Sequence, residues 1–222
     1  GTMQYTHRMK DNTEIDLPLG KVVCVGRNYA DHAAELNNPI PTEPMLFIKP
    51  ASSVVALEEP FVVPQGLGAV HFETEMAILI GERLQHADLS AAKAAIAGVG
   101  LGLDLTLRDL QDDLKKKGHP WEKAKAFDGA CPLSVFVQPD QVTDLQNQQI
   151  RLTVNGEQRQ DGNSGQMLNQ VLPLISYISA FFTLEPGDVV LTGTPAGVGP
   201  VMAGDELLVE LTDLLSVQTT AR

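Results

Sequence analysis

The strongest constraint on the fold is a segment in which two carboxylates directly precede an apolar run. Residues 71–75 are His-Phe-Glu-Thr-Glu, and residues 76–80 are Met-Ala-Ile-Leu-Ile. Because side chains alternate faces along a strand, His71, Glu73 and Glu75 are expected to point to one side. The sequence therefore predicts acids at the mouth of a buried strand. The alternative is an ordinary solvated strand face.

Two carboxylates on one face repel each other unless a cation lies between them. Asp104, at the end of a later predicted strand, could supply a third oxygen ligand. A site built only from oxygen suits Mg²⁺ or Mn²⁺ better than Zn²⁺. We therefore predict a metal site formed by Glu73, Glu75 and Asp104.

The glycines of residues 98–104 alternate with apolar residues, in the order Gly-Val-Gly-Leu-Gly-Leu-Asp. A dinucleotide fingerprint has a different last gap and opens a helix, so this segment does not predict one. A strand with a bare glycine face instead lets another backbone approach closely. Asp104 would project from that face at the strand end.

Asp104, Arg108 and Gln111 are spaced i, i+4 and i+7. If a helix begins near Asp104, the three share a face and could hold an anionic, oxygenated substrate. A solvated helix with an ion pair is the alternative. The lysine run 115–117 is explained by the helix dipole, and no function is assigned to it.

His32 and Glu35 are spaced i, i+3 in a short predicted helix. A histidine held by a carboxylate is a common general base near neutral pH, although a surface pair without function is the alternative. The preceding loop 26–29, which contains Arg27, follows a buried strand, where active-site loops tend to lie.

Two further segments carry polar groups. Lys123 and Lys125 lie among aromatic residues, so one of them could be desolvated and reactive, or could simply extend to solvent. Residues 192–199 lack the Gly-Lys-Ser/Thr of a nucleotide loop, but their hydroxyl and N–H groups could bind a small carboxylate. A purely structural turn is the alternative.

Composition limits the function classes. The 222 residues are 43% hydrophobic and carry a net charge of −12, which argues against nucleic acid as a partner. The two cysteines form no CxxC pair, which fits a reducing cytoplasm. No signal peptide or membrane-length apolar run is recognised.

The expected architecture is one mixed α+β, β-rich domain over residues 21–222, after an N-terminal extension over residues 1–20 whose first two residues resemble a tag remnant. An Asn155-Gly156 turn predicts a hairpin over 150–162. Other strands are expected at 21–26, 45–48, 54–57, 61–63, 75–80, 101–105, 133–137, 189–191, 206–211 and 216–219. Helices are expected at 28–36, 91–97 with Ser90 as N-cap, 107–117 ending at Gly118, and 167–182, where Pro173 implies a late start or a kink.

Taken in order, these segments resemble the fumarylacetoacetate hydrolase family, in particular its short, single-domain branch. The resemblance covers nearly the whole chain. It rests on the segments 26–29 with His32, 46–50, 71–75, 103–109, 120–121 with 124–128, and 186–188 leading into 192–199.

The resemblance implies a β-roll, usually a homodimer, that binds Mg²⁺ or Mn²⁺ through the three acids. It implies that Arg108, Gln111, Lys125 and Thr194 face the substrate, and we assign Arg27 to substrate binding as well. It also implies that His32 and Glu35 activate water on a lid, and that His71 neighbours the metal ligands without being one.

The resemblance implies a 2-oxo acid substrate that chelates the metal and reacts through an enolate. We expect hydrolysis of the C–C bond of an acylpyruvate, with Lys125 and Gln111 stabilising the oxyanion. The alternatives are an oxaloacetate keto–enol tautomerase or decarboxylase and a 2-hydroxyhepta-2,4-dienedioate isomerase. A metal- or ligand-binding protein without activity is the alternative from a different class.

Overall fold

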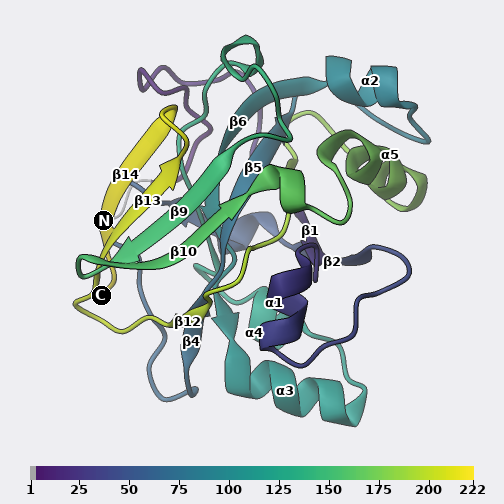
Figure 1. The fold of residues 1–222 in the computed structure, drawn as a ribbon. Helices are drawn as coiled ribbons and strands as arrows, with labels where there is room; N and C mark the ends of the chain where they lie inside the picture. The colour runs from purple at the N-terminus through teal and green to yellow at the C-terminus, as the bar shows by residue number, and fades with distance from the viewer. Residues whose placement is uncertain (1–3) are drawn as a thin grey trace.

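The computed structural model describes residues 4–222. Its strands form three sheets, with a few short helices around them (Figure 1). The predicted β-rich α+β class is confirmed. No helix in the described part is long and apolar enough to cross a membrane. The expected tag remnant at residues 1 and 2 lies outside the described residues, and the boundary at residue 21 stays a prediction.

The largest sheet has seven strands in the order β2-β1-β11-β5-β6-β8-β3. Its strands are β1 (Val22–Gly26), β2 (Met45–Lys49), β3 (Val54–Ala56), β5 (Thr74–Ile80), β6 (Ile96–Leu103), β8 (Cys131–Leu133) and β11 (Val189–Leu191).

Both faces of this sheet are covered at its centre, because every residue of β5 is buried. Met76 and Ile78 belong to the larger core cluster, whereas Ala77 and Leu79 belong to a second cluster on the opposite face. This alternation is the period-two pattern of a strand between two apolar layers.

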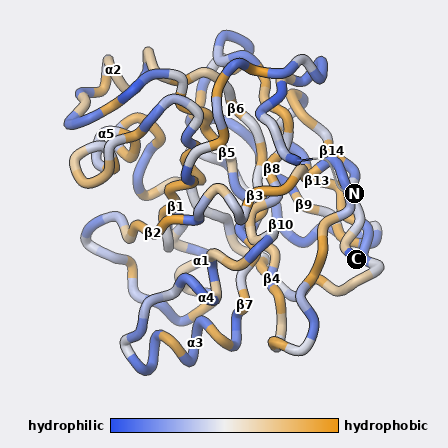
Figure 2. Tube along the Cα trace, turned by 180° about the vertical axis from the view of Figure 1, so that it is seen from behind, coloured by the Kyte–Doolittle hydropathy of each residue, from blue (hydrophilic) through white to orange (hydrophobic). Residues whose placement is uncertain are grey.

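Figure 2 shows the chain from behind. In that view α3 (Arg108–Lys117) alternates between hydrophilic and hydrophobic stretches, as an amphipathic surface helix does.

A four-stranded sheet supplies one of these layers, in the order β10-β9-β13-β14. Its strands are β9 (Gln149–Val154), β10 (Glu157–Asn163), β13 (Glu206–Leu211) and β14 (Leu215–Thr220). The predicted hairpin is confirmed: Asn155 and Gly156 both have positive φ, at 50° and 80°, as a tight hairpin turn requires. The N-terminal residues Tyr5 and Met9 pack on the other face.

The third sheet consists of β12 (Gly199–Pro200), β4 (Val70–Phe72) and β7 (Thr106–Leu107), in the order β12-β4-β7. The chain passes from β4 to β5 at Glu73, and from β6 to β7 at Asp104 and Leu105. The Asp104 N–H donates to the Glu73 carbonyl oxygen over 2.8 Å. The antiparallel pair β5–β6 thus continues into the antiparallel pair β4–β7 of another sheet, and both chains cross between the sheets at this hydrogen bond. This brings Glu73 and Asp104 side by side.

This break corrects two predictions. Residues 71–75 do not form one continuous strand, since the chain leaves one sheet at Glu73 and enters another. Asp104 is not part of a helix with Arg108 and Gln111, because β7 intervenes and α3 begins only at Arg108. A carboxylate at a sheet change can turn toward a site that a regular strand or helix position would not reach.

The helices are short. Figure 1 places α1 (Ala30–Glu35), α3 and α4 (Glu122–Lys125) at the end of the molecule near β4, and α2 (Leu89–Ala94) and α5 (Val171–Phe181) at the opposite end. As predicted, α3 ends at Gly118, which has the left-handed φ of 67°, and the last helix starts late, at Val171.

Three other local predictions need correction. The N-cap of α2 is Asp88, whose side chain accepts from the Ala91 N–H, and not Ser90. Residues 61–63 form no strand beyond an isolated bridge at Phe61, and the strand expected at 133–137 is instead β8, over 131–133. At the two strands, the paired backbone, which the local sequence does not reveal, decides the boundary.

The glycine face of β6 makes the predicted close approach. A Cβ at Gly100 would lie 2.9 Å from both Ser134 Oγ and the Val135 carbonyl oxygen. We expect Gly100→Ala to lower the free energy of unfolding by about 1–3 kcal/mol, since overpacking of a filled interior costs this much. Gly26→Ala is the matched control, because its Cβ would make only an ordinary 3.8 Å contact with Met45. Urea unfolding measures both variants, and equal stabilities would contradict the packing argument.

Candidate active site

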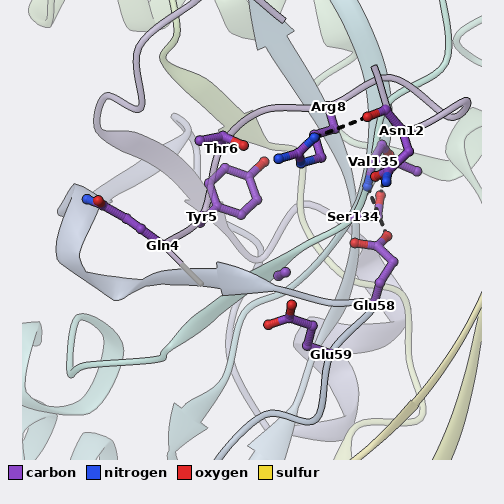
Figure 3. Close-up of a pocket in the computed structure, with 10 residues that line it drawn as sticks. Gln4, Tyr5, Thr6, Arg8, Asn12, Glu58, Glu59, Ser134 and Val135 are labelled. Atoms are coloured by element: carbon purple, nitrogen blue, oxygen red, sulfur yellow. Dashed lines mark hydrogen bonds between the residues drawn. The ribbon is translucent and has the colours of Figure 1, made fainter. Parts of the chain in front are cut away.

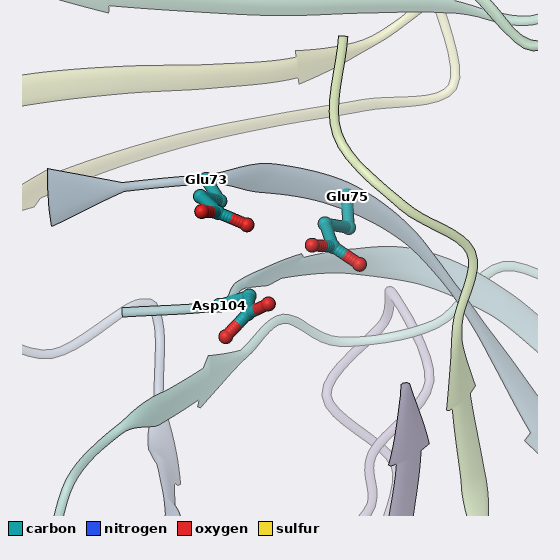
Figure 4. A group of neighbouring side chains, drawn as sticks. All are labelled: Glu73, Glu75 and Asp104. Carbon is teal, nitrogen blue, oxygen red and sulfur yellow. The ribbon is translucent and has the colours of Figure 1, made fainter. Parts of the chain in front are cut away.

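Three buried carboxylates converge where the strands change sheets. One oxygen each of Glu73, Glu75 and Asp104 lies within 4.8 Å of the others. Figure 4 shows the three side chains around a common space, two from the β4–β5 segment and one from the end of β6. The sequence prediction that these acids meet is thus confirmed by their positions, while their role as metal ligands remains a prediction.

Cationic side chains surround the three acids. Lys125 Nζ, from α4, lies 2.9 Å from Asp104 Oδ2 and 3.4 Å from Glu73 Oε1, and it also donates to the Thr106 hydroxyl. Arg108 Nη2, from α3, lies 2.5 Å from Glu73 Oε2. Buried carboxylates are stable only with such partners, because burial strongly disfavours an unpaired charge.

The pKa shifts reflect this crowding. Burial, together with the charges of Asp104 and Glu73, raises the pKa of Glu75 well above its ordinary value. Burial also opposes ionisation of Glu73, but the charges of Lys125 and Arg108 outweigh it and lower the pKa of that carboxyl. Burial would lower the pKa of Lys125, yet Asp104 and Glu73 raise it. Lys125 is therefore held as an ammonium ion, which donates hydrogen bonds and is not a base.

The donor set fits a hard divalent cation. Asp104 Oδ1 lies 2.8 Å from Lys49 Nζ, but it accepts no hydrogen bond. The reason is that Lys49 directs its protons to the carbonyl oxygens of Leu105, Lys125 and Ala130. Asp104 Oδ1, which accepts from no donor, and the Glu75 carboxyl, whose pKa its neighbours raise, therefore leave oxygen atoms available as ligands between the acids. Mg²⁺ or Mn²⁺ would bind there through oxygen ligands alone.

Arg108 links the acids to α3. Its Nη1 donates to Gln111 Oε1 over 2.7 Å, and its Nε donates to His71 Nδ1 over 3.2 Å. Burial and the charge of Arg108 lower the pKa of His71, which favours the neutral ring that accepts this bond. His71 thus contacts Arg108, as expected of a neighbour of the metal ligands, and not the carboxylate cluster itself.

The predicted pair on α1 is formed. His32 Nδ1 lies 2.8 Å from Glu35 Oε2, and the backbone N–H of Gly197 donates to both oxygens of Glu35. Since a carboxylate that receives these bonds is an acceptor, the proton of the His32 ring lies on Nδ1. In the neutral ring, Nε2 can then accept a proton, as a general base must.

The carboxylate cluster and the His32–Glu35 pair both face one narrow cavity of about 30 Å³. Every predicted site residue except Glu35 and Glu75 lines it, and those two contact it through His32 and through the carboxylate cluster. Arg27 lines it in the left-handed conformation, with φ of 57°. This conformation is strained for a residue with a side chain and is often found at functional sites. The lining residues include Arg27, His32, Glu73, Asp104, Arg108, Gln111, Lys115, Lys125 and Thr194.

Two residues of this region were not predicted. Lys115, assigned only to the helix dipole, lines the cavity, and its Nζ lies 5.9 Å from the centre of the Trp121 ring. Its i+4 spacing from Gln111 was an available signal. Lys49 is fully buried at the end of the apolar strand β2, and a lysine in that setting requires partners. Of the two lysines left open, Lys125 is buried and Lys123 is exposed.

A wider hollow of about 410 Å³ lies elsewhere, beside the N-terminal segment (Figure 3). Glu58 accepts there from the Val135 N–H, and burial raises its pKa. Glu59 and Arg8 face the same space. Among the described residues, its lining includes neither a convergent carboxylate cluster nor a histidine–carboxylate pair, so the narrower cavity is the better candidate for the active site.

The sequence comparison identifies the family. The family described as fumarylacetoacetate (FAA) hydrolase, C-terminal, matches residues 21–222. The chain belongs to this family. This agrees with the resemblance noted from the ordered motifs.

Similar proteins include two oxaloacetate tautomerases. That of Escherichia coli (strain K12) is 52% identical over 92% of this chain and 94% of its own length. The mitochondrial oxaloacetate tautomerase of Bos taurus is 44% identical over 89% of each chain. Among solved structures, fumarylpyruvate hydrolase from Pseudomonas aeruginosa in complex with Mn²⁺ and pyruvate superposes with a TM-score of 0.91. It is 35% identical and covers 100% of this chain and 97% of its own.

The chain is therefore an enzyme of a family that includes tautomerases, hydrolases and isomerases. A protein without activity, the alternative from a different class, is no longer favoured. The expected acylpyruvate hydrolysis is supported only at the level of the family, whereas the two tautomerases, at 52% and 44% identity, support the oxaloacetate alternative.

The carboxylate cluster can be tested by metal binding. We expect Glu75→Gln to weaken Mn²⁺ binding by about tenfold or more, because a hard cation loses one charged oxygen ligand. Isothermal titration calorimetry measures this, with Glu122→Gln, an exposed glutamate of α4, as the control. Wild-type affinity after all three acids are replaced by alanine would refute the assignment.

Proposed function

We propose that this chain interconverts the enol and keto forms of oxaloacetate with the help of Mg²⁺ or Mn²⁺. Glu73, Glu75 and Asp104 would hold the cation, whose chemistry is to stabilise negative charge on the enolate oxygen. The proposal is supported by the tautomerases at 52% and 44% identity and by the Mn²⁺ and pyruvate in the similar hydrolase structure.

The charge balance of the cavity is the observation that favours a dicarboxylate as the substrate. Lys49, Lys125 and Arg108 offset the three carboxylates, so that a divalent cation would leave an excess of positive charge. Arg27 and Lys115 add further positive charge at the cavity wall. Such a site favours a dianion such as oxaloacetate over an acylpyruvate with a neutral acyl group.

The histidine–carboxylate pair would move the proton. Tautomerisation takes a proton from the enol hydroxyl and delivers one to the neighbouring carbon, with no net consumption of water. His32 Nε2 is free to accept and return a proton while Glu35 holds the ring. Lys125, held as an ammonium, would stabilise the developing oxyanion together with Gln111.

Wild-type protein should accelerate the decay of enol-oxaloacetate, followed by its ultraviolet absorbance. The rate should fall to background after chelation with EDTA and return with Mg²⁺ or Mn²⁺. Acylpyruvate cleavage and oxaloacetate decarboxylation are measured in parallel. Rapid acylpyruvate cleavage without any tautomerisation would reverse the choice of reaction, and full activity after rigorous chelation would exclude the metal.

A single substitution tests the proton carrier. His32→Gln should lower tautomerisation by about 10²-fold or more, the usual contribution of a general acid–base group. Decarboxylation should suffer less, because it needs no proton carrier before the C–C bond breaks. The matched control is His119→Gln, which changes an exposed histidine outside the cavity. Unchanged tautomerisation in His32→Gln would place the proton carrier elsewhere.

We also propose a homodimer in the cytoplasm. Cys24 and Cys131 are both buried free thiols, which fits a reducing compartment. The homodimer rests on the family resemblance alone. Light scattering would test it, and a monomer at micromolar concentration would contradict it.

A further inference from the structure

Thr194 carries an unused hydroxyl proton at the cavity wall. Its Oγ1 accepts a hydrogen bond from Gln160 Nε2 over 2.8 Å and donates none to the residues that the structure describes. Neighbouring Thr192 differs, because its hydroxyl donates to the Met76 carbonyl oxygen over 2.7 Å. Of these two threonines, only Thr194 lines the cavity. A 2-oxo acid carboxylate accepts hydrogen bonds but donates none, so a free hydroxyl proton at this place suits it.

Gln160 determines which way that hydroxyl bonds. Gln160 lies on β10, is 1% exposed, and has all of its amide groups engaged. Its Oε1 accepts from the Thr74 N–H over 3.1 Å, and its Nε2 donates to the Pro195 carbonyl oxygen over 2.9 Å.

The orientation of this amide is fixed by backbone groups that each have only one role. The Thr74 N–H can only donate, so the amide oxygen must face it. The Pro195 carbonyl can only accept, so the amide nitrogen must face it. The remaining amide proton then points at Thr194, whose oxygen becomes the acceptor. Rotating the amide by half a turn would break both backbone bonds.

We propose that Gln160 is a positioning residue for substrate binding: it makes Thr194 a hydrogen-bond donor to the carboxylate of the 2-oxo acid. This inference rests on the proposed function for its substrate class. Gln160 reaches the site from the β9–β10 hairpin, whereas the other groups come from the large sheet, the helices and the 192–199 loop. Its contribution is the direction of one hydroxyl, and it does not touch the reacting atoms.

The test is a double-mutant cycle on Gln160 and Thr194, read out as the dissociation constant for pyruvate in the presence of Mg²⁺. Gln160→Met keeps the shape of the side chain but frees the hydroxyl, and Thr194→Val removes the hydroxyl. Each should weaken pyruvate binding by about tenfold, the effect of losing a hydrogen bond to a charged group. The double variant should bind like either single variant, because the two act through one bond.

Kinetics and stability separate positioning from general damage. KM for oxaloacetate should rise with the pyruvate dissociation constant, while kcat changes by less than about threefold. Gln160→Glu should weaken binding more than Gln160→Met, because a carboxylate would accept the Thr194 proton for itself. Gln158→Met, on the exposed part of the same hairpin, is the control and should match wild type. Thermal melting and Mn²⁺ calorimetry report whether each variant is folded.

Several outcomes would overturn the inference. If Gln160→Met weakened pyruvate binding equally in the wild-type and Thr194→Val backgrounds, Gln160 would not act through the Thr194 hydroxyl. Wild-type pyruvate binding by Thr194→Val would refute the donor role even if every Gln160 variant failed to fold. If the double-mutant cycle on pyruvate binding gave the expected result but the protein did not tautomerise oxaloacetate, only the proposed function would be refuted. A wild-type protein that binds neither pyruvate nor oxaloacetate would overturn both proposals.

Discussion

The burial of three carboxylates in one place is the constraint on which the site depends. Glu73, Glu75 and Asp104 cannot share a dry interior unless positive charge reaches them. The fold supplies it from three separate segments: Lys49 at the end of β2, Arg108 at the start of α3, and Lys125 at the end of α4. The short helices at this end of the molecule thus do more than cover the sheet, since they carry the charges that make the cluster possible.

The loop after β11 joins the parts of the site. The Gly193 N–H donates to Glu75 Oε1 over 2.8 Å, and the Gly197 N–H holds Glu35. Between them, Thr194 is fixed by Gln160. One loop therefore touches the carboxylate cluster, the histidine–carboxylate pair and the β9–β10 hairpin. A shift of this loop would disturb the proposed metal ligands, proton carrier and carboxylate donor together.

The same arrangement explains why the family can run several reactions. Tautomerisation, decarboxylation and hydrolysis all pass through an enolate, and each needs positive charge at the same oxygen. They differ in what else must be delivered: hydrolysis consumes a water molecule, whereas tautomerisation only moves a proton. This is why the presence of the His32–Glu35 pair did not separate the reactions, and why the additional cations Arg27 and Lys115, together with the relatives, shift the proposal toward oxaloacetate.

The sequence by itself determined the periodic and chemically distinctive parts. Residue type marked the three acids as candidate metal ligands, although the continuous alternation expected for residues 71–75 is broken at Glu73. The buried strand after Glu75, the Asn155-Gly156 hairpin and the end of α3 at Gly118 follow from local alternation and turn geometry. These signals are short-range, so no tertiary contact is needed to recognise them. The ordered motifs added the family and, with it, the β-roll.

Only the tertiary structure decided where the chain leaves one sheet for another and what each polar group meets there. The break at Glu73 and the turn at Asp104 arise because two strand pairs change partners at the same level, which no local pattern encodes. The roles of Lys49 and Gln160 have the same origin. Their partners lie far away in the sequence, and a buried amine or amide is defined by the groups that surround it and not by its neighbours along the chain.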